Sequence, residues 1–204
     1  PDFWHDRWAK CQIVFHQHDY NNHMQEFIDR LEVKPGGHIR VPLCGKSLDM
    51  LWLLEQGYSV TGVEISPLAV EDFFAENRLS SHITDLPDAC LYTSKHLNIY
   101  CADFFNVDLT HIPHIDAVYD RASLIAMPAD MRPAYADRLT SLIPAGTRSL
   151  LVTLDYPQEE MDGPPFSVTP DEVRQLFSSR YSIEPLHSED CLVNEPHFKD
   201  KGLT

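Results

Sequence analysis

The segment from residue 39 to residue 66 constrains the fold of this chain most, because it predicts a strand, a tight turn and a helix followed by a second strand. Residues 39–44 are short, apolar and followed by Gly45, which is typical of a buried strand. Ser47 can cap the helix, and Gly57 stands where a helix ends in the left-handed conformation. This order predicts a parallel pair of strands joined by a helix.

The second strand of this unit, residues 59–65, carries an acid near its end. Glu64 follows Gly45 by 19 residues. In folds that bind nucleotide-type ligands, the backbone approaches the ligand at the first turn, and an acid at the end of strand two accepts bonds from ribose hydroxyls. An alternative is that Glu64 is a surface acid that happens to close an apolar strand.

The glycine content of the first turn limits the kind of ligand. A dinucleotide fingerprint needs three glycines for close approach to a pyrophosphate, and only Gly45 is present, which disfavours NAD and FAD. The fragment GKS resembles a phosphate loop, but Arg40 stands where that loop needs its first glycine. A nucleoside cofactor without phosphates remains, and S-adenosylmethionine fits that description.

The rest of the chain alternates strands with helices, which predicts a single α/β domain over residues 1–204. We expect a Rossmann-like, mostly parallel central sheet with helices on both faces. Residues 80–94 show little periodicity and are expected to be a partly ordered excursion. The other expected elements are helices at 22–31, 68–77, 133–142 and from Thr169, and strands at 97–101, 115–119, 149–154 and from Ile183.

Two tryptophans stand four residues apart near the start of the chain, so Trp4 and Trp8 would share one face of a helix. They either pack an N-terminal helix on the domain or form a lid, residues 1–31, whose indoles stack on a ligand. His16 and His18 form an H-x-H pair without a partner set at a closed-site spacing, so we expect no metal.

Four candidate groups follow expected strands, where ligands of open α/β sheets lie. They are the turn at Leu43, the acid Glu64, the pair Asp103-Phe104, and Arg121. Asp103 either caps the next segment or accepts a bond from an adenine amino group, with Phe104 against the ring. Arg121 either pairs with the preceding aspartate or binds a carboxylate or an anionic substrate through two hydrogen bonds. Leu43 is either core or a residue whose backbone faces the ligand.

Composition and charge exclude several functions. A formal charge of −15 argues against nucleic acid, and no apolar run approaches the length of a membrane span. The five cysteines lack a C-x-x-C pair and are expected to be reduced and mostly buried. No secretory signal opens the chain, so we expect a cytoplasmic protein, and we expect a monomer.

No Ser-His-Asp or Cys-His constellation is visible, so no catalytic residue is named. Methyl transfer to a thiol agrees with this, because a thiolate attacks without a dedicated base. The protein then supplies proximity, alignment and dry walls.

Several motifs together resemble the bacterial thiopurine S-methyltransferases, over nearly the whole chain. They are WHDRW, VPLCGKSLDMLWL, GVEIS, CADFF, AVYDRASLIA, TLDYP and DGPPFSV. The resemblance implies a class I S-adenosylmethionine-dependent methyltransferase that acts on aromatic and heterocyclic thiols, with links to selenium and tellurium compounds and to tellurite resistance. By motif position it places Phe15 near the acceptor. Around the cofactor it places Trp8, Leu43, Glu64, Asp103, Phe104 and Arg121.

Two features depart from the family pattern. His197 stands where the family often carries an arginine near the substrate, and a neutral histidine would hold an anionic acceptor less well. The sequence stops at Thr204, where the family pattern leads us to expect one more strand. Two other functions remain as alternatives: an NAD-type oxidoreductase, and a non-catalytic protein that binds nucleosides or chalcogen compounds.

Overall fold

The computed structural model describes residues 2–13, 16–110, 112, 114–193, 196–200 and 202–203; of residues 196 and 197 it describes only the backbone. These residues form two compact units, each described separately below. The first comprises residues 1–120 and 142–151, and the second comprises residues 121–141 and 152–204. Among the described residues, no helix has both the length and the apolar character that crossing a bilayer requires.

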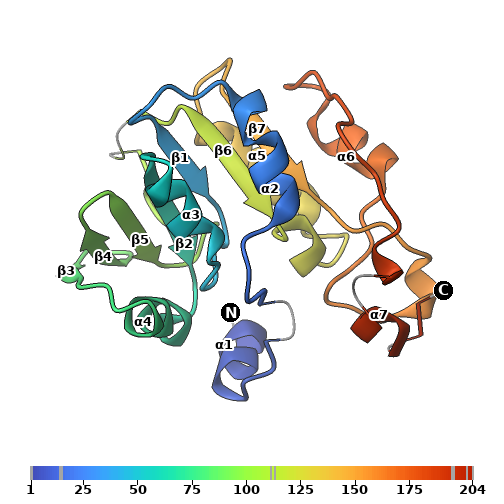
Figure 1. Cartoon of the computed structure of the whole chain (residues 1–204), viewed down its shortest axis with the longest axis horizontal. Helices are drawn as coiled ribbons and strands as arrows, with labels where there is room; N and C mark the ends of the chain where they lie inside the picture. Colours follow the sequence, from blue (N-terminus) through green and yellow to red (C-terminus); the bar gives the residue numbers. More distant parts are fainter. Residues whose placement is uncertain are drawn as a thin grey trace. The chain divides into compact units, whose positions relative to one another are not determined.

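The first unit contains the sheet and the helices that precede or connect its central strands (Figure 1). Its helices are α1 (Asp2–Ala9), α2 (Asn22–Phe27), the 3-10 helix η1 (Ile28–Leu31), α3 (Asp49–Glu55) and α4 (Pro67–Glu76). Its strands are β1 (His38–Val41), β2 (Ser59–Glu64), β3 (His82–Asp85), β4 (Cys90–Ser94), β5 (Leu97–Cys101), β6 (Ala117–Arg121) and β7 (Arg148–Val152), the last residues of β6 and β7 belonging to the second unit.

The strands of the described chain form one seven-stranded sheet in the order β3-β4-β5-β2-β1-β6-β7. β1 pairs in parallel with β2 and β6, and β2 pairs in parallel with β5. The middle strands are almost completely buried, with Ile39, Val60 and Ile99 each at 0% exposure. The expected mostly parallel α/β sheet is therefore confirmed.

The predicted strand–turn–helix–strand unit is confirmed with small shifts in its bounds. β1 ends at Val41 rather than at residue 44, because the chain turns at residues 42 and 43. α3 begins at Asp49, and its N-cap is Leu48 without a side-chain bond, so the expectation that Ser47 caps this helix is wrong, although the Asp49 amide donates to Ser47 Oγ. Gly57 has the left-handed φ of 86° expected after the helix. Ser66 caps α4 through the amide of Ala69, as the Ser-Pro pair predicts.

Two expectations about regular structure are wrong. Residues 80–94 are not a partly ordered excursion, because β3 and β4 form an antiparallel hairpin that extends the sheet beyond β5 (Figure 1). The strand expected from Ile183 is absent, since the structure assigns no strand to residues 182–190. β3 is exposed along its whole length, so it lacks the apolar alternation by which a strand is recognised in sequence.

The second unit contains short helices and long connecting segments. Thr169 caps α6 through the amide of Glu172, with Pro170 as the first helical residue, as predicted. Arg132, at the start of α5, is 2% exposed and places Nη1 2.7 Å from both carboxylate oxygens of Glu172, which ties α5 to α6. The helices of this unit are η2 (Leu124–Ala126), α5 (Arg132–Ser141), η3 (Gln158–Glu160), α6 (Pro170–Phe177), η4 (Cys191–Val193) and α7 (Pro196–Asp200).

Gly62 in β2 leaves space for the side chain that follows the first strand. A Cβ added at Gly62 would lie 2.6 Å from Cys44 Sγ and 3.4 Å from Met50 Sδ. We expect Gly62→Ala to lower the free energy of unfolding by about 1–3 kcal/mol, because it overpacks this contact. Urea unfolding measures the change. The cost should shrink in a Cys44→Ala background, and an equal cost in both backgrounds would contradict this account.

Candidate functional site

The carboxyl ends of the central strands bring several predicted site residues to one edge of the sheet. β1, β2 and β5 run parallel, and their last residues are Val41, Glu64 and Cys101. Glu64 and Cys101 are direct partners across the β2–β5 pair. Ligands of open α/β sheets bind beyond this edge.

The turn after β1 has an unusual backbone. Leu43 has a φ of 43°, a conformation that costs energy for a residue with a Cβ, and Gly45 has a φ of 52°. Between them, the amide of Cys44 donates to the carbonyl of Val63 on β2 over 2.9 Å. The turn is therefore bound to the neighbouring strand, and Leu43 is half-buried.

Glu64 is buried, at 6% exposure, and its carboxylate links the turn after β1 to the residue that caps α4. Its Oε2 accepts from the amide of Gly45 over 2.8 Å, and its Oε1 accepts from the amide of Ser66 over 2.8 Å. Burial raises the pKa of the Glu64 carboxyl above its ordinary value, while these backbone bonds oppose the rise. The amide of Ile65 also donates to this carboxylate. A carboxylate offers about four acceptor positions, so these three backbone bonds leave capacity for a ligand hydroxyl.

Trp8 lies against the same turn. A Cβ added at Gly45 would stand 3.3 Å and 3.7 Å from two atoms of the Trp8 ring, so glycine makes room for the indole. Trp8 is 4% exposed, and its helix α1 contacts α4. The expected N-terminal helix packed on the domain is confirmed; the ligand-stacking role of Trp8 stays a prediction.

Lys46, the lysine of the GKS fragment, forms ion pairs with two carboxylates. It is 7% exposed, and its Nζ lies 2.6 Å from Glu76 Oε1 and 3.7 Å from Asp72 Oδ2, both on α4. This ion pair connects the turn to α4, which agrees with discounting a phosphate loop. Sequence reasoning missed the partners because they lie about one helix further along the chain.

Asp103 and Phe104 follow β5 next to Glu64. The amide of Ala102 donates to the carbonyl of Glu64 over 2.8 Å, which fixes this segment beside β2. The Asp103 carboxylate accepts from the amide of Phe105 over 2.9 Å and from Asn106 Nδ2 over 2.7 Å. Asp103 thus caps its own turn, and its role toward an adenine stays a prediction. Phe104 is buried at 2% exposure.

Three further candidates are not placed beside these residues. Arg121 is the half-buried last residue of β6 and the first residue of the second unit. Phe15 and the side chain of His197 lie outside the described residues. Their predicted roles toward donor and acceptor stay predictions.

The structure has all five cysteines free, and the expectation that most of them are buried is wrong. Only Cys44 is buried; Cys11 is exposed, and the other three are half-buried. Burial, with Glu64 nearby, raises the pKa of Cys44 well above its ordinary value and the pKa of Cys101 to about 12. These two thiols stay protonated near neutral pH, so neither is a ready nucleophile.

Comparison with known proteins decides the family. The sequence model for "Thiopurine S-methyltransferase" matches residues 1–204. The thiopurine S-methyltransferase of Nitrosospira multiformis is 44% identical over 203 residues, which cover 100% of this chain and 92% of that protein. That of Pseudomonas fluorescens is 43% identical over 204 residues and 94% of its length.

The chain belongs to the thiopurine S-methyltransferase family. It is an S-adenosylmethionine-dependent methyltransferase, which rejects the oxidoreductase alternative. Its fold is the class I methyltransferase fold. The magnesium protoporphyrin IX methyltransferase of Synechocystis PCC 6803, solved with bound SAM, superposes with a TM-score of 0.59 at 15% identity, covering 88% of this chain and 84% of that one. A SAM-dependent methyltransferase from Anabaena variabilis gives a TM-score of 0.54 at 16% identity, covering 96% and 79%.

The residues of the first unit fit a donor of this kind. Glu64 keeps acceptor capacity at the sheet edge, and the turn from residue 43 to residue 45 contains no phosphate-binding set, since Lys46 is paired with α4. A ribose can be held by the carboxylate, and an amino-acid tail by turn backbone, without a pyrophosphate site.

Trp8→Ala tests whether the indole is more than packing. We expect the variant to raise the donor dissociation constant, because the ring covers the Gly45 turn next to Glu64. Isothermal calorimetry with S-adenosylmethionine measures this. Phe3→Ala, which changes an exposed aromatic residue of the same helix, is the control. Equal donor affinity in Trp8→Ala and the parent would assign Trp8 to packing alone.

The raised pKa of Glu64 predicts a pH dependence of donor binding. Hydroxyl groups donate more strongly to an ionised carboxylate, and a raised pKa means that Glu64 takes up its proton at a higher pH than the ordinary 4.5. Donor affinity should therefore fall as the pH drops toward that raised pKa. Glu64→Gln should flatten this profile. An unchanged slope in Glu64→Gln would show that another group titrates.

Proposed function

We propose that this enzyme transfers the methyl group of S-adenosylmethionine to the sulfur of aromatic and heterocyclic thiols, including thiopurines. The observation that carries the donor half is the buried Glu64 carboxylate, which joins the Gly45 turn to the start of α4 and keeps acceptor capacity for a sugar. The name shared by the relatives at 43–44% identity supports the acceptor half.

Each proposed contact follows from a group at the sheet edge. Glu64 would accept bonds from the ribose hydroxyls, and the turn at Leu43 would face the amino-acid tail. Asp103 and Phe104 would bind the adenine, and Trp8 would cover the donor as part of an N-terminal lid of residues 1–31. Arg121 and Phe15 complete the site by the family resemblance.

Methyl transfer to a thiolate needs no nucleophile or general base from the protein. When bound, the donor supplies an electrophilic methyl carbon on a sulfonium, and the acceptor's thiolate forms the new S–C bond as the sulfonium–carbon bond breaks. The chain contributes alignment and exclusion of water. Burial of Trp8, Cys44 and Phe104 gives this edge apolar walls, and no protein nucleophile is required.

The proposal has finer parts that rest on the resemblance alone. They are methylation of selenium and tellurium compounds and a role in tellurite resistance. Catalysis without a bound metal is instead expected from the spacing of His16 and His18. The cytoplasmic location, the monomeric state and the single domain over residues 1–204 stay predictions from the sequence.

Glu64→Ala tests the donor half. Loss of a hydrogen bond to a charged group costs about 1–3 kcal/mol, so the donor dissociation constant should rise by roughly 5- to 150-fold. Calorimetry with S-adenosylmethionine measures it. Glu26→Ala, which removes an exposed carboxylate on α2, is the matched control. Parental affinity in Glu64→Ala would remove Glu64 from the site.

Transfer of a labelled methyl group tests the acceptor half. The enzyme is incubated with methyl-labelled donor and, in separate reactions, 6-mercaptopurine, a simple aromatic thiol, a selenol and tellurite. We expect labelled thioether from the two thiols. Binding of donor and thiol without labelled product would instead support the non-catalytic alternative, and product from selenol or tellurite alone would move the proposal to those acceptors.

A further inference from the structure

Asp49 is a buried carboxylate that sequence reasoning did not single out. It is the first residue of α3, four residues after Gly45, and it is 1% exposed. A carboxylate this far from water costs free energy unless its oxygens are hydrogen-bonded. The hydrogen-bond partners of Asp49 therefore identify the segments that this side chain connects.

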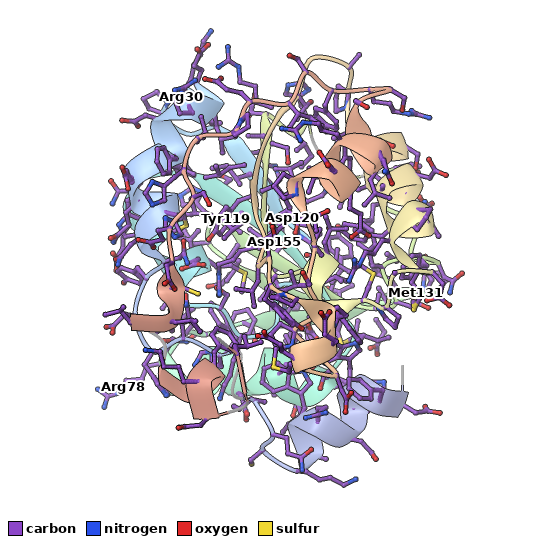
Figure 2. All side chains as sticks on the ribbon, turned by 90° about the vertical axis from the view of Figure 1, so that its right-hand side faces the viewer. Arg30, Arg78, Tyr119, Asp120, Met131 and Asp155 are labelled. Atoms are coloured by element: carbon purple, nitrogen blue, oxygen red, sulfur yellow. The ribbon has the colours of Figure 1, made fainter. Side chains whose placement is uncertain are left out.

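Both oxygens of Asp49 accept bonds from parts of the chain distant in sequence. Oδ1 accepts from the backbone amide of Asn21 over 2.8 Å, and Oδ2 accepts from the Tyr119 hydroxyl over 2.9 Å. Tyr119 is 1% exposed on β6; Figure 2 labels it among the interior side chains, whereas Arg30 and Arg78 lie at the periphery of the first unit. The carboxylate joins α3, β6 and the residue that caps α2.

The Asn21 contact fixes the end of the N-terminal segment, residues 8–21, of which 14 and 15 lie outside the described part of the chain. Asn21 also caps α2, because its Oδ1 accepts from the amide of Met24 over 3.0 Å. At the other end of the same segment, Trp8 lies against Gly45. The N-terminal segment therefore meets the turn and the start of α3 twice, at Gly45 through Trp8 and at Asp49 through Asn21.

Removing one partner of a buried charged group costs more stability than replacing the whole set by apolar residues. The groups left behind stay desolvated and lack a hydrogen-bond partner. An apolar residue at position 49 would fill the volume but could not accept from Asn21 N–H and Tyr119 O–H together. The contact set is thus specific to a group with two acceptor oxygens.

We propose that Asp49 is a positioning residue for methyl transfer: it holds the N-terminal segment, through Asn21, in the place where Trp8 covers the donor-binding turn. This rests on the proposed function, since it assumes that the donor binds at Gly45 and Glu64. Asp49 touches neither reactant. Its contribution is to donor affinity, through the segment that it anchors.

The test compares Asp49→Asn, Tyr119→Phe and the parent by calorimetry with S-adenosylmethionine. Asn retains one acceptor oxygen and presents an NH2 group to a donor, so one of the two bonds is lost. We expect the donor dissociation constant to rise about tenfold in Asp49→Asn. Tyr119→Phe leaves the Asn21 bond in place and should give a smaller rise.

Two further readouts separate positioning from general destabilisation. Hydrogen exchange should accelerate in residues 10–13 and 16–21 of Asp49→Asn more than in the central strands β1 and β2. With saturating donor, kcat should return toward the parent value while KM for the donor stays raised. Thr169→Ala, which removes the cap of α6, is the control for a loss of stability elsewhere, and it should leave donor affinity unchanged.

The outcomes are distinguishable. Parental donor affinity and parental exchange in the N-terminal segment of Asp49→Asn, with only a lower unfolding temperature, would reduce Asp49 to a structural residue and overturn the inference alone. If Asp49→Asn does not fold, Asn21→Pro decides, because proline fits the φ of −68° at this position and removes the N–H that donates to Asp49. Asn21→Ala, which removes only the cap of α2, is its control, and equal donor affinity in these two variants overturns the inference. A parent protein that binds no donor would overturn the proposed function together with the inference.

Discussion

The bridge from the Glu64 carboxylate to the amides of Gly45 and Ser66 is the contact on which the rest of the edge depends. It joins the turn after β1 to the start of α4, so the two connections that flank β2 are held at fixed spacing. The left-handed backbone at Leu43 persists because this bridge and the Cys44–Val63 bond restrain the two residues that follow it. Trp8 then lies on a surface that the bridge has already fixed.

Two buried side chains, Lys46 and Asp49, connect the residues after this turn to other parts of the first unit. Lys46 pairs with Asp72 and Glu76 and fixes the turn to α4, while Asp49 accepts from the N-terminal segment and from β6. A glycine-rich turn binds a pyrophosphate by close backbone approach, and this turn contains one glycine. The chain instead holds its turn by side chains, which suits a donor without phosphates.

Sequence patterns identified the central strands because these strands are buried on both faces and read as continuous apolar runs. They missed the β3–β4 hairpin, since β3 is exposed along its length and its sequence, His-Ile-Thr-Asp, has no apolar face. The strand predicted from Ile183 is wrong because a β-branched residue forms a strand only where another strand pairs with it, and the structure assigns no strand to residues 182–190.

The sequence by itself determined the α/β order, the turn at Gly45 and the acid that closes β2, because each depends on residues adjacent in the chain. Only the tertiary structure decided which groups that acid, Lys46 and Asp49 bind. Asn21 and Tyr119 are 28 and 70 residues from Asp49, and a hydrogen bond over such a separation has no periodic signal in the sequence. Local propensity fixes elements, whereas the partners of buried charges are set by how those elements pack.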